Sequence, residues 1–332
     1  MPLTRRALMT AGLALPAALA AAPARAQPSA AASWPSRPVR VVVAYPPGGS
    51  TDVLARTIVP RLQELIPGAT FVVENRPGGA AVVGTQAVAQ AAPDGHTLAL
   101  GNNQTHAANA AMLRGLPYDP LADFAPVGRI AEVHHALVVP ASSPARTLQD
   151  LAARGKGGGR LAYASSGVGS ASHVIAESFV RREGLAATHV PYRGGAQATT
   201  DTVAGVVDFF VSTWPQVVAL VRDGRLRALG IGAPQRLPDL PEVPTFAELG
   251  AGYMAVDAWF GLWAPARTPD AVVARLGATL LRVLAEPEIV ARLQQQGFAA
   301  APLDPAAFAA FQREEVRRWE ELVALTGIRL EG

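Results

Sequence analysis

The protein has 332 residues, with 50% hydrophobic and 17% charged side chains, 29 basic and 26 acidic residues, and no cysteine. This length exceeds what one core usually organises, so we expect two domains. The lack of cysteine excludes disulfides, thiolate catalysis and cysteine-ligated metal sites.

The first 26 residues have the pattern of a secretory signal peptide. Arg5 and Arg6 give a positive start, residues 7–22 form an apolar stretch interrupted by Pro16, and residues 24–26 (ARA) resemble a cleavage site. The paired arginines fit twin-arginine export, although an ordinary secretory signal can also carry two arginines. We therefore expect an exported protein.

Removing residues 1–26 removes three arginines and no acid, which leaves 26 basic and 26 acidic residues. This balance gives no reason to expect nucleic acid or an anionic membrane as a partner. No later segment offers 18 consecutive apolar residues, so we expect no direct insertion into the membrane. A location in the periplasm fits these features.

Short apolar, β-branched runs alternate with segments of helical periodicity after an expected flexible leader at 27–36. The expected strands are 39–45, 70–73, 97–100, 127–139, 161–164, 188–190, 206–211 and 226–231, and the expected helices include 50–65, 80–92, one that follows Ser170, one ending near Val203 and one beginning near Pro215. The tail from 269 to 327 is expected to be almost all helix, with an amphipathic last element at 305–325. This alternation predicts two α/β domains with parallel sheets.

Three glycine-rich connections join a strand to a helix, at 46–52, 165–170 and 192–196. A helix N-terminus offers unpaired N–H groups and the positive end of the helix dipole, and glycine lets a ligand approach the backbone. Such loops meet at the carboxyl ends of parallel strands and can hold a carboxylate. The alternative is structural, because any strand–helix connection favours glycine and an N-capping hydroxyl.

Other polar residues near strand ends have two interpretations each. Thr105 and His106 belong to a polar cluster that follows a strand and are ligand candidates. Asp52 can simply complement the helix dipole. Asp208 lies in an apolar run and needs a partner, which could be a ligand amine or a protein N–H group. His173 could contact a ligand or cap its own helix.

Enzyme and cofactor motifs are weak or absent. No nucleophile elbow, complete dinucleotide-binding glycine motif or phosphate-loop lysine occurs, and the histidines lack metal-binding spacing. We therefore expect no cofactor, no metal and no enzyme. A secreted serine hydrolase that uses Ser166 or Ser170 with His173 or His106 stays open as an alternative.

Eight motifs occur in an order that resembles the Bug family, the extracytoplasmic solute receptors of tripartite tricarboxylate transporters. They are VxYPPGGSTD from 43, VENRPGG from 73, AAPDGHTL from 91, YASSGVGSASH from 163, VPYRGGAQA from 190, GVVD from 205, RLRALG from 225 and PEVPTFAELG from 241. The resemblance implies a periplasmic-binding-protein fold, with two α/β lobes around a ligand cleft and a helical C-terminal tail. It also implies a non-enzymatic receptor that closes on a small carboxylate and delivers it to a membrane permease. A sensor module that presents its ligand to a signalling receptor would share the fold.

The resemblance also implies lobe boundaries and site residues. With crossings near 138–140 and 255–260, lobe 1 would comprise 37–138 and 257–332, and lobe 2 would comprise 139–256. The positions that match the family's ligand loops are Tyr45, Gly49, Ser50, Thr51, Asp52, Thr105, His106, Ser166, Gly167, Gly169, Ser170, Gly195, Ala196 and Asp208. Val82 and Val168 replace residues that are often more polar in the family, and with Trp214 they suggest a ligand with an apolar body.

Overall fold

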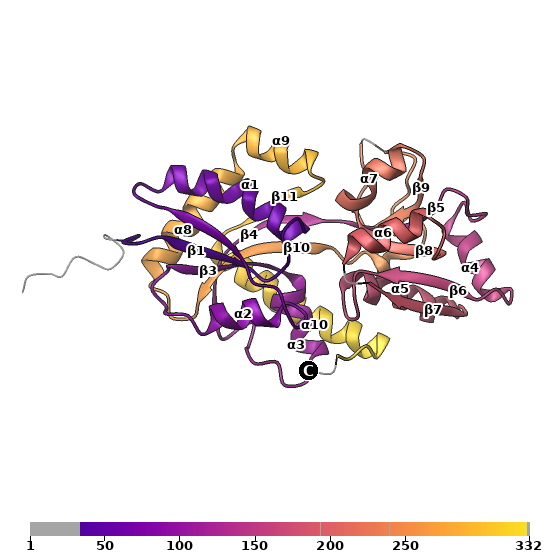
Figure 1. Ribbon diagram of the computed structural model, residues 1–332, viewed down its shortest axis with the longest axis horizontal. Coiled ribbons are helices and arrows are strands. Elements are labelled where there is room, and N and C mark those ends of the chain that lie inside the picture. Colours follow the sequence, from indigo (N-terminus) through magenta and orange to yellow (C-terminus); the bar gives the residue numbers. More distant parts are fainter. Residues whose placement is uncertain (1–33, 193, 239, 331–332) are drawn as a thin grey trace, which may run out of the picture.

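The computed structural model describes residues 34–192, 194–238 and 240–330, and the expected signal peptide lies outside these ranges. Figure 1 shows two lobes side by side along the long axis, each built around one sheet. The end of the expected flexible leader packs against the first lobe, because Trp34 is 3% exposed and its carbonyl accepts a hydrogen bond from Arg275. The α/β fold class is confirmed.

The first sheet is mixed rather than parallel. Its order is β11-β4-β10-β3-β1-β2, and its strands are β1 (Val39–Val43), β2 (Phe71–Asn75), β3 (Thr97–Asn102), β4 (Phe124–Val133), β10 (Ala258–Pro265) and β11 (Ala299–Leu303). Strand β1 runs parallel to β2 and β3, whereas β10 pairs antiparallel with β3 and β4. The late strand β10 therefore fills the middle of a sheet that the N-terminal strands begin.

Helices cover both faces of this sheet (Figure 1). They are α1 (Ser50–Leu65), α2 (Val82–Ala89), the π-helical turn η1 (Gln104–Ala108), α3 (Asn109–Met112), α8 (Asp270–Leu284), α9 (Pro287–Gln295) and α10 (Pro305–Thr326). Apolar residues at helical spacing face inward, as Leu276, Leu280 and Val283 do on α8. Helix α2 lies so close to β1 that a Cβ on Gly84 would come within 2.9 Å of the Ala44 Cα.

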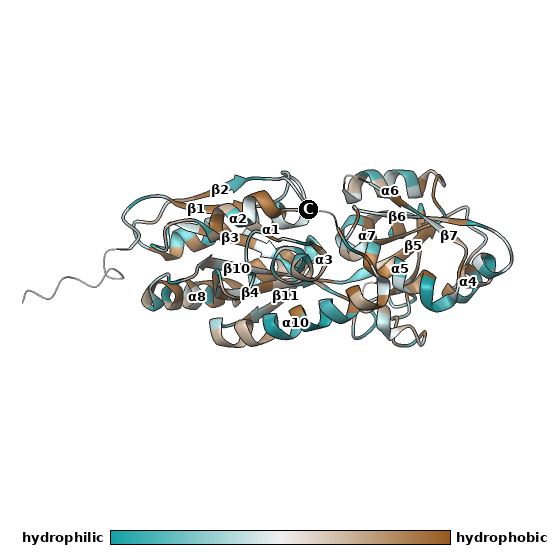
Figure 2. Ribbon diagram, turned by 90° about the horizontal axis from the view of Figure 1, so that it is seen from below, coloured by the Kyte–Doolittle hydropathy of each residue, from teal (hydrophilic) through white to brown (hydrophobic). Residues whose placement is uncertain are grey.

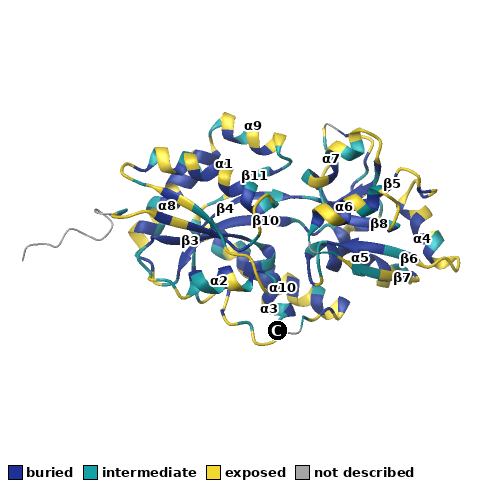
Figure 3. Cartoon of the chain, in the orientation of Figure 1, coloured by how far each residue is buried: buried dark blue, intermediate teal, exposed yellow. Residues whose placement is uncertain are grey.

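The second sheet is also mixed, with the order β7-β6-β8-β5-β9. Its strands are β5 (His135–Pro140), β6 (Leu161–Ser165), β7 (Ala187–Pro191), β8 (Phe209–Thr213) and β9 (Leu226–Ile231), and its helices are α4 (Leu148–Lys156), α5 (Ala171–Glu183), α6 (Gly195–Val203), α7 (Trp214–Arg222) and the 3-10 turn η2 (Gly252–Met254). The inner strands β5, β6 and β8 are mostly apolar and buried (Figures 2 and 3), whereas the edge strand β7 is partly exposed along its length.

The chain passes between the sheets at His134 and again at 255–257. The two passages are joined, since His134 Nδ1 lies 2.9 Å from an Asp257 carboxylate oxygen and His135 Nδ1 lies 2.8 Å from the Val256 carbonyl. Sheet membership favours a first crossing at His134, earlier than the expected one at 138–140. The extended segment 127–139 hides this break, because no glycine or proline lies between Arg129 and Val139.

Two segments in the second half of the chain are strands that the sequence analysis missed. All eight residues of β10 are buried, so the strand shows no alternation of polar and apolar residues. Strand β11 interrupts the tail that was expected to be almost all helix. Helix α10, which the sequence pattern predicts, is fixed to β10 by buried hydrogen bonds from Trp259 Nε1 to Glu315 (2.7 Å) and from Trp263 Nε1 to Gln312 (3.0 Å).

Direct contacts also hold the lobes together away from the crossings. Helix α10 packs against α5. Leu330 pairs with Leu113 of the first lobe, and a Cβ added to Gly169 of the second lobe would lie 2.8 Å from the Leu330 side chain. A Cβ added to Gly297 would similarly lie 2.7 Å from Pro215.

Candidate functional site

The first loop connects β1 to α1 and leaves the N-terminus of α1 open. Gly49 is the N-cap and therefore supplies no capping side chain. The first helical hydrogen bond runs from the Val53 amide to the Gly49 carbonyl, at 2.9 Å. The amides of residues 50–52 have no intrahelical acceptor, and no partner for them occurs among the described residues. Three N–H donors at the positive end of a helix can bind an anion.

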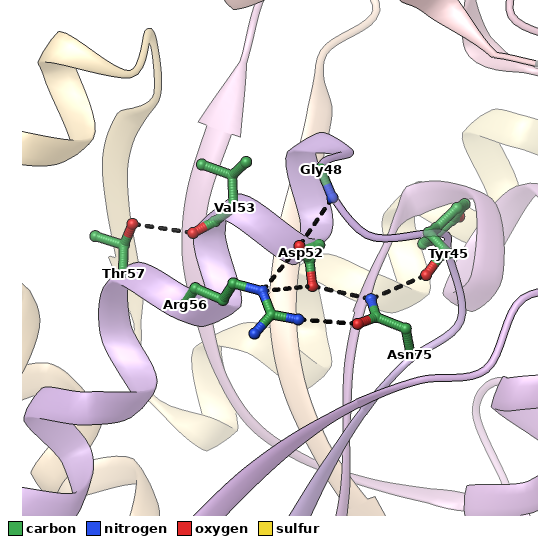
Figure 4. Close-up of polar contacts among 7 residues, drawn as sticks. All are labelled: Tyr45, Gly48, Asp52, Val53, Arg56, Thr57 and Asn75. Carbon is green, nitrogen blue, oxygen red and sulfur yellow. Dashed lines mark hydrogen bonds and ion pairs between the residues drawn. The ribbon is translucent and has the colours of Figure 1, made fainter.

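Asp52 holds this loop in place (Figure 4). Its carboxylate accepts hydrogen bonds from the Gly48 amide at 2.9 Å, from Arg56 Nε at 3.0 Å and from Asn75 Nδ2 at 2.9 Å. Burial alone would raise the pKa of Asp52, but the hydrogen bonds from Arg56, Gly48 and Asn75 bring it below its ordinary value. Because these donors already surround the carboxylate, its role here is to shape the loop.

Tyr45 joins the loop to the polar cluster after β3. Its hydroxyl donates to Asn102 Oδ1 at 2.8 Å, and burial raises its pKa. Thr105 is 1% exposed and bonds His106 Nδ1 at 2.8 Å. His106 has no exposed surface and stacks on Trp263 with ring centroids 3.6 Å apart. Burial lowers its pKa to about 3, so His106 is a neutral residue of the lobe interior.

The second loop, between β6 and α5, is closed on itself. Ser170 is the N-cap of α5, and its side chain accepts a hydrogen bond from the His173 amide at 3.3 Å. The other internal bonds occupy four loop amides, those of Ser166 (to Ser172 Oγ, 2.9 Å), Gly167 (to Ser165 Oγ, 3.2 Å), Gly169 (to His173 Nδ1, 3.1 Å) and Ser170 (to the Gly167 carbonyl, 3.2 Å). Most backbone N–H donors of this loop are therefore used in hydrogen bonds that maintain its conformation.

Glycine is required at two positions of this loop. Gly167 has φ 141° and Gly169 has φ 75°, in the region that side chains disfavour. Between them Val168 points its side chain outward, with 47% of the residue exposed. The amide of Val168 has no partner among the described residues.

The third loop precedes α6. Its N-cap is Gly194, with φ 138° and no capping side chain, and Gly195 and Ala196 form the first helical positions. The Gly195 Cα faces the Gln216 side chain, because a Cβ there would lie 2.0 Å from Gln216 Oε1. This helix start is open in the same sense as that of α1.

Asp208 does not belong with these loops, which corrects the sequence-based assignment. The strand begins only at Phe209, and the pairing of Tyr163 with Phe209 places Asp208 at the N-terminal ends of β6 and β8. Its carboxylate accepts hydrogen bonds from Arg154 and from the Ala162 amide, at 2.9 and 2.8 Å. The loops lie at the opposite, carboxyl ends of the strands. Asp208 therefore has a structural role, in which protein N–H groups are its partners.

Trp214 is also structural, since it is 5% exposed and packs in the core of the second lobe. The two serines of the hydrolase alternative bond to Ser172 and not to a histidine ring, at 3.1 Å for Ser166 Oγ and 2.9 Å for Ser170 Oγ. Ser165 does contact His189 Nε2 at 2.6 Å, but it has no exposed surface and a substrate could not reach it.

Two surface grooves are lined by residues outside the three loops. One, of about 810 Å³, lies between residues 110–121 and α10, and the other, of about 530 Å³, lies between α1 and α9. In the described part of the chain, no three histidine or acidic side chains are grouped to hold a metal ion, and no helix is both long and apolar enough to cross a membrane.

Comparison with known proteins decides the family. Residues 54–328 match the model of the tripartite tricarboxylate transporter family receptor. The chain belongs to this family. Protein BugT of Bordetella pertussis is 34% identical over 307 residues, which cover 92% of this chain and 94% of BugT. The family is one of binding proteins, so the chain is a receptor of the Bug type and not an enzyme, as the motifs predicted.

Solved structures of relatives agree with the fold of this receptor. Rpa4515 of R. palustris, solved with adipate, is 34% identical with a TM-score of 0.82 and covers 89% of this chain and 99% of its own. MatC of Rhodopseudomonas palustris, solved with bound malate, is 34% identical with a TM-score of 0.78 and covers 87% of this chain and 100% of its own. The two-lobed periplasmic-binding-protein fold is thereby confirmed.

Three residues that shape the loops of this receptor were not among the sequence candidates. Arg56 follows Asp52 by four residues, a spacing that the sequence does reveal. Asn75 lies in the VENRPGG motif, but only the pairing of β1 with β2 brings it to Asp52. His189 reaches Ser165 because β7 pairs with β6, and no local signal predicts that register.

Proposed function

We propose that this chain is a periplasmic receptor that captures a small carboxylate between its lobes and delivers it to the membrane permease of a tripartite tricarboxylate-type transporter. The open N-terminus of α1 carries the proposal, since it offers three unpartnered amides at residues 50–52. Family membership and the carboxylates bound by two relatives support it. The proposed lobes are residues 34–134 with 257–330, and residues 135–256.

The proposed contacts are polar and mostly uncharged. On the first lobe they come from Gly49, Ser50 and Thr51, with Tyr45 nearby and Asp52 shaping the loop. On the second lobe they come from the 165–170 loop and from the start of α6 at Gly195 and Ala196. A ligand that contacts both lobes favours the closed arrangement over an open one, which is how such a receptor would signal its loading to a permease.

The exposed side chain of Val168 favours a ligand with an apolar body between or beside its carboxylates. Val168 is 47% exposed on the second loop, where a polar residue would be easier to hydrate. A dicarboxylate with a chain of methylene groups, such as adipate, would therefore bind more tightly than citrate. Binding of short polyacids alone would contradict this part of the proposal.

Thermal unfolding of residues 27–332 with adipate, malate and citrate tests the function. A ligand at about 100 times its Kd adds about 2.7 kcal/mol of stability, which raises Tm by several degrees. Adipamide, which keeps the chain length of adipate without its charges, is the matched control and should leave Tm unchanged. If no carboxylate shifts Tm in protein freed of co-purified ligand, the proposal fails.

A further inference from the structure

Two histidines from different elements stack behind the second loop. His173 lies in the first turn of α5 and His189 lies on β7, and their rings are nearly parallel with centroids 3.7 Å apart. Tyr163 of β6 extends the stack, with its ring 5.0 Å from that of His189. His173 is only 7% exposed and His189 is half-buried, so the pair lies largely beneath the loop.

Each histidine contacts the loop through one ring nitrogen. The Gly169 amide donates to His173 Nδ1 at 3.1 Å, and His189 Nε2 lies 2.6 Å from Ser165 Oγ. Ser165 Oγ in turn bonds both the amide and the carbonyl of Gly167. The histidines therefore reach both glycines that flank the exposed Val168.

The first of these contacts fixes the protonation state of His173. A backbone N–H group can only donate, so Nδ1 must carry a free lone pair, and the ring is neutral with its proton on Nε2. Protonation of Nδ1 would set two donors against each other at 3.1 Å. The loop geometry thus depends on an unprotonated His173. His189 Nε2 carries its proton and donates to Ser165 Oγ, because the one hydroxyl proton of Ser165 goes to the Gly167 carbonyl, and this contact persists when His189 is protonated.

We propose that His173 and His189 are positioning residues, which hold the 165–170 loop in the shape that binds the carboxylate ligand. This inference rests on the proposed function. The amides of Ser166, Gly167 and Ser170 are held by serine hydroxyls or within the loop, whereas the Gly169 amide is held by His173, next to the exposed Val168. Release of the Gly169 amide would let Val168 and its unpartnered N–H turn away from the ligand.

The surroundings of the pair keep His173 neutral. Burial is the main cause that lowers its pKa to about 4, and His189 and Arg181 add to this effect. Glu177 opposes it, but this carboxylate is already engaged by the Tyr163 hydroxyl and by Arg181 Nε, at 2.5 and 2.7 Å. His173 therefore accepts a proton only in acid.

Amide hydrogen exchange of the ligand-free protein tests the positioning role directly. The readout is the protection of a peptide that spans residues 166–172. His173→Leu removes the acceptor, and protection should fall by about fivefold, the equivalent of one neutral hydrogen bond. His173→Asn keeps an acceptor near the position of Nδ1 and should retain the protection. Equal protection in the wild type and in His173→Leu would overturn the proposal.

Calorimetric titration with adipate and malate then tests the consequence for binding. At neutral pH, His173→Leu should weaken binding by about tenfold, while His173→Asn and His189→Gln stay within about twofold. On acidification, the wild type should lose more affinity than His173→Asn at the same pH, a comparison that cancels the protonation of the probe itself. His96→Asn, a change in the first lobe, is the control for loss of a histidine.

The two experiments separate the possible failures. If the wild type binds neither probe, the carboxylate proposal fails, and the exchange data still decide whether His173 holds the loop. If the wild type binds but His173→Leu and His173→Asn bind equally well with the same pH dependence, the positioning role is wrong. If His173→Leu does not fold, the pH dependence of His173→Asn decides.

Discussion

The loops at 46–52 and 165–170 have the same sequence plan but are stabilised in opposite ways. The first is held by the buried carboxylate of Asp52 and leaves the amides of α1 free. The second is held by neutral serines and histidines, and Ser170 caps α5. In the first loop, Asp52 in the first turn of α1 makes the supporting contacts and no side chain caps the helix. In the second loop, Ser170 caps the helix and His173 and His189 add contacts to the loop. Similar motifs therefore give one loop whose backbone amides are available to a ligand, and one loop whose amides are mostly used in internal hydrogen bonds.

The largest expected difference between the loops is their response to acid. The pKa of His173 falls from 6.5 to about 4 on folding, so the unfolded chain binds more protons within this interval. Its contribution to stability is complete above about pH 6.5 and is lost as the pH falls toward 4, a change of about 3 kcal/mol. Asp52, with a lowered pKa, keeps its contribution throughout this range and loses it only at lower pH.

Urea unfolding between pH 7 and 4 measures this response. His106 adds an acid-sensitive contribution from the first lobe, because its pKa is also lowered, to about 3. The informative quantity is therefore the free energy of unfolding that each protein loses relative to its own value at pH 7. This loss should be larger for the wild type than for His173→Asn, and the difference should grow as the pH falls. Parallel curves for the two proteins would show that the second loop is not the acid-sensitive one.

Asp52→Ala should have the next largest effect. It leaves the Gly48 amide and one Asn75 donor without their acceptor, which costs about 2 kcal/mol in the free energy of unfolding. Arg56→Ala is the matched control and should cost less than about 1 kcal/mol, because the Arg56 side chain is 54% exposed. Chemical denaturation at pH 7 measures both, and equal losses would contradict a buried carboxylate at the centre of the loop.

Gly49→Ser would make the first loop resemble the second. The backbone at Gly49 has φ −76°, and a Cβ there would meet only the Pro46 carbonyl at 3.6 Å, so serine fits. Its hydroxyl would cap α1 and compete with a ligand carboxylate for the same amides. We expect unchanged or slightly higher stability and about tenfold weaker adipate binding by calorimetry. Unchanged affinity would mean that the α1 amides do not bind the ligand.

Ser170→Ala should have the smallest effect. Loss of an N-cap typically costs about 1 kcal/mol, here through the His173 amide and the other hydrogen bonds of the hydroxyl. Thr147, which caps α4 far from the loop, offers a matched control as Thr147→Ala. Both variants should lose similar stability in urea, but only Ser170→Ala should weaken adipate binding. A loss of binding in both would point to a general effect of helix capping.

The sequence was sufficient for features that depend on local chemistry. The start of α1 at Ser50, the glycine-rich loops and the amphipathic α10 follow from residue types and periodicity. Asp208 was misplaced among the site residues because its apolar neighbours were taken for a longer strand, whereas Val206 is 64% exposed and the strand begins at Phe209. The local pattern did not show where the buried strand started.

Features that depend on pairing between distant segments were not predictable in the same way. Strand β10 joins β3 and β4 across more than 100 residues, and its uniformly buried side chains give no period of two. The passage at His134 lies within a segment that was expected to be extended throughout, and no glycine or proline stands next to it. The stack of His173 on His189 likewise arises only when α5 is packed against β7.

The position of β10 has a consequence for the order in which the protein can fold during synthesis. Strands β3 and β4 leave the ribosome early, but the strand that pairs with both is made only after the whole second sheet. Until then β3 and β4 expose unpaired edges, which invite association with other chains. The second lobe, which is continuous in sequence, can fold first. We therefore expect that the unpaired strands within the first 134 residues must be kept from associating with other chains until β10, which ends at residue 265, has been synthesised.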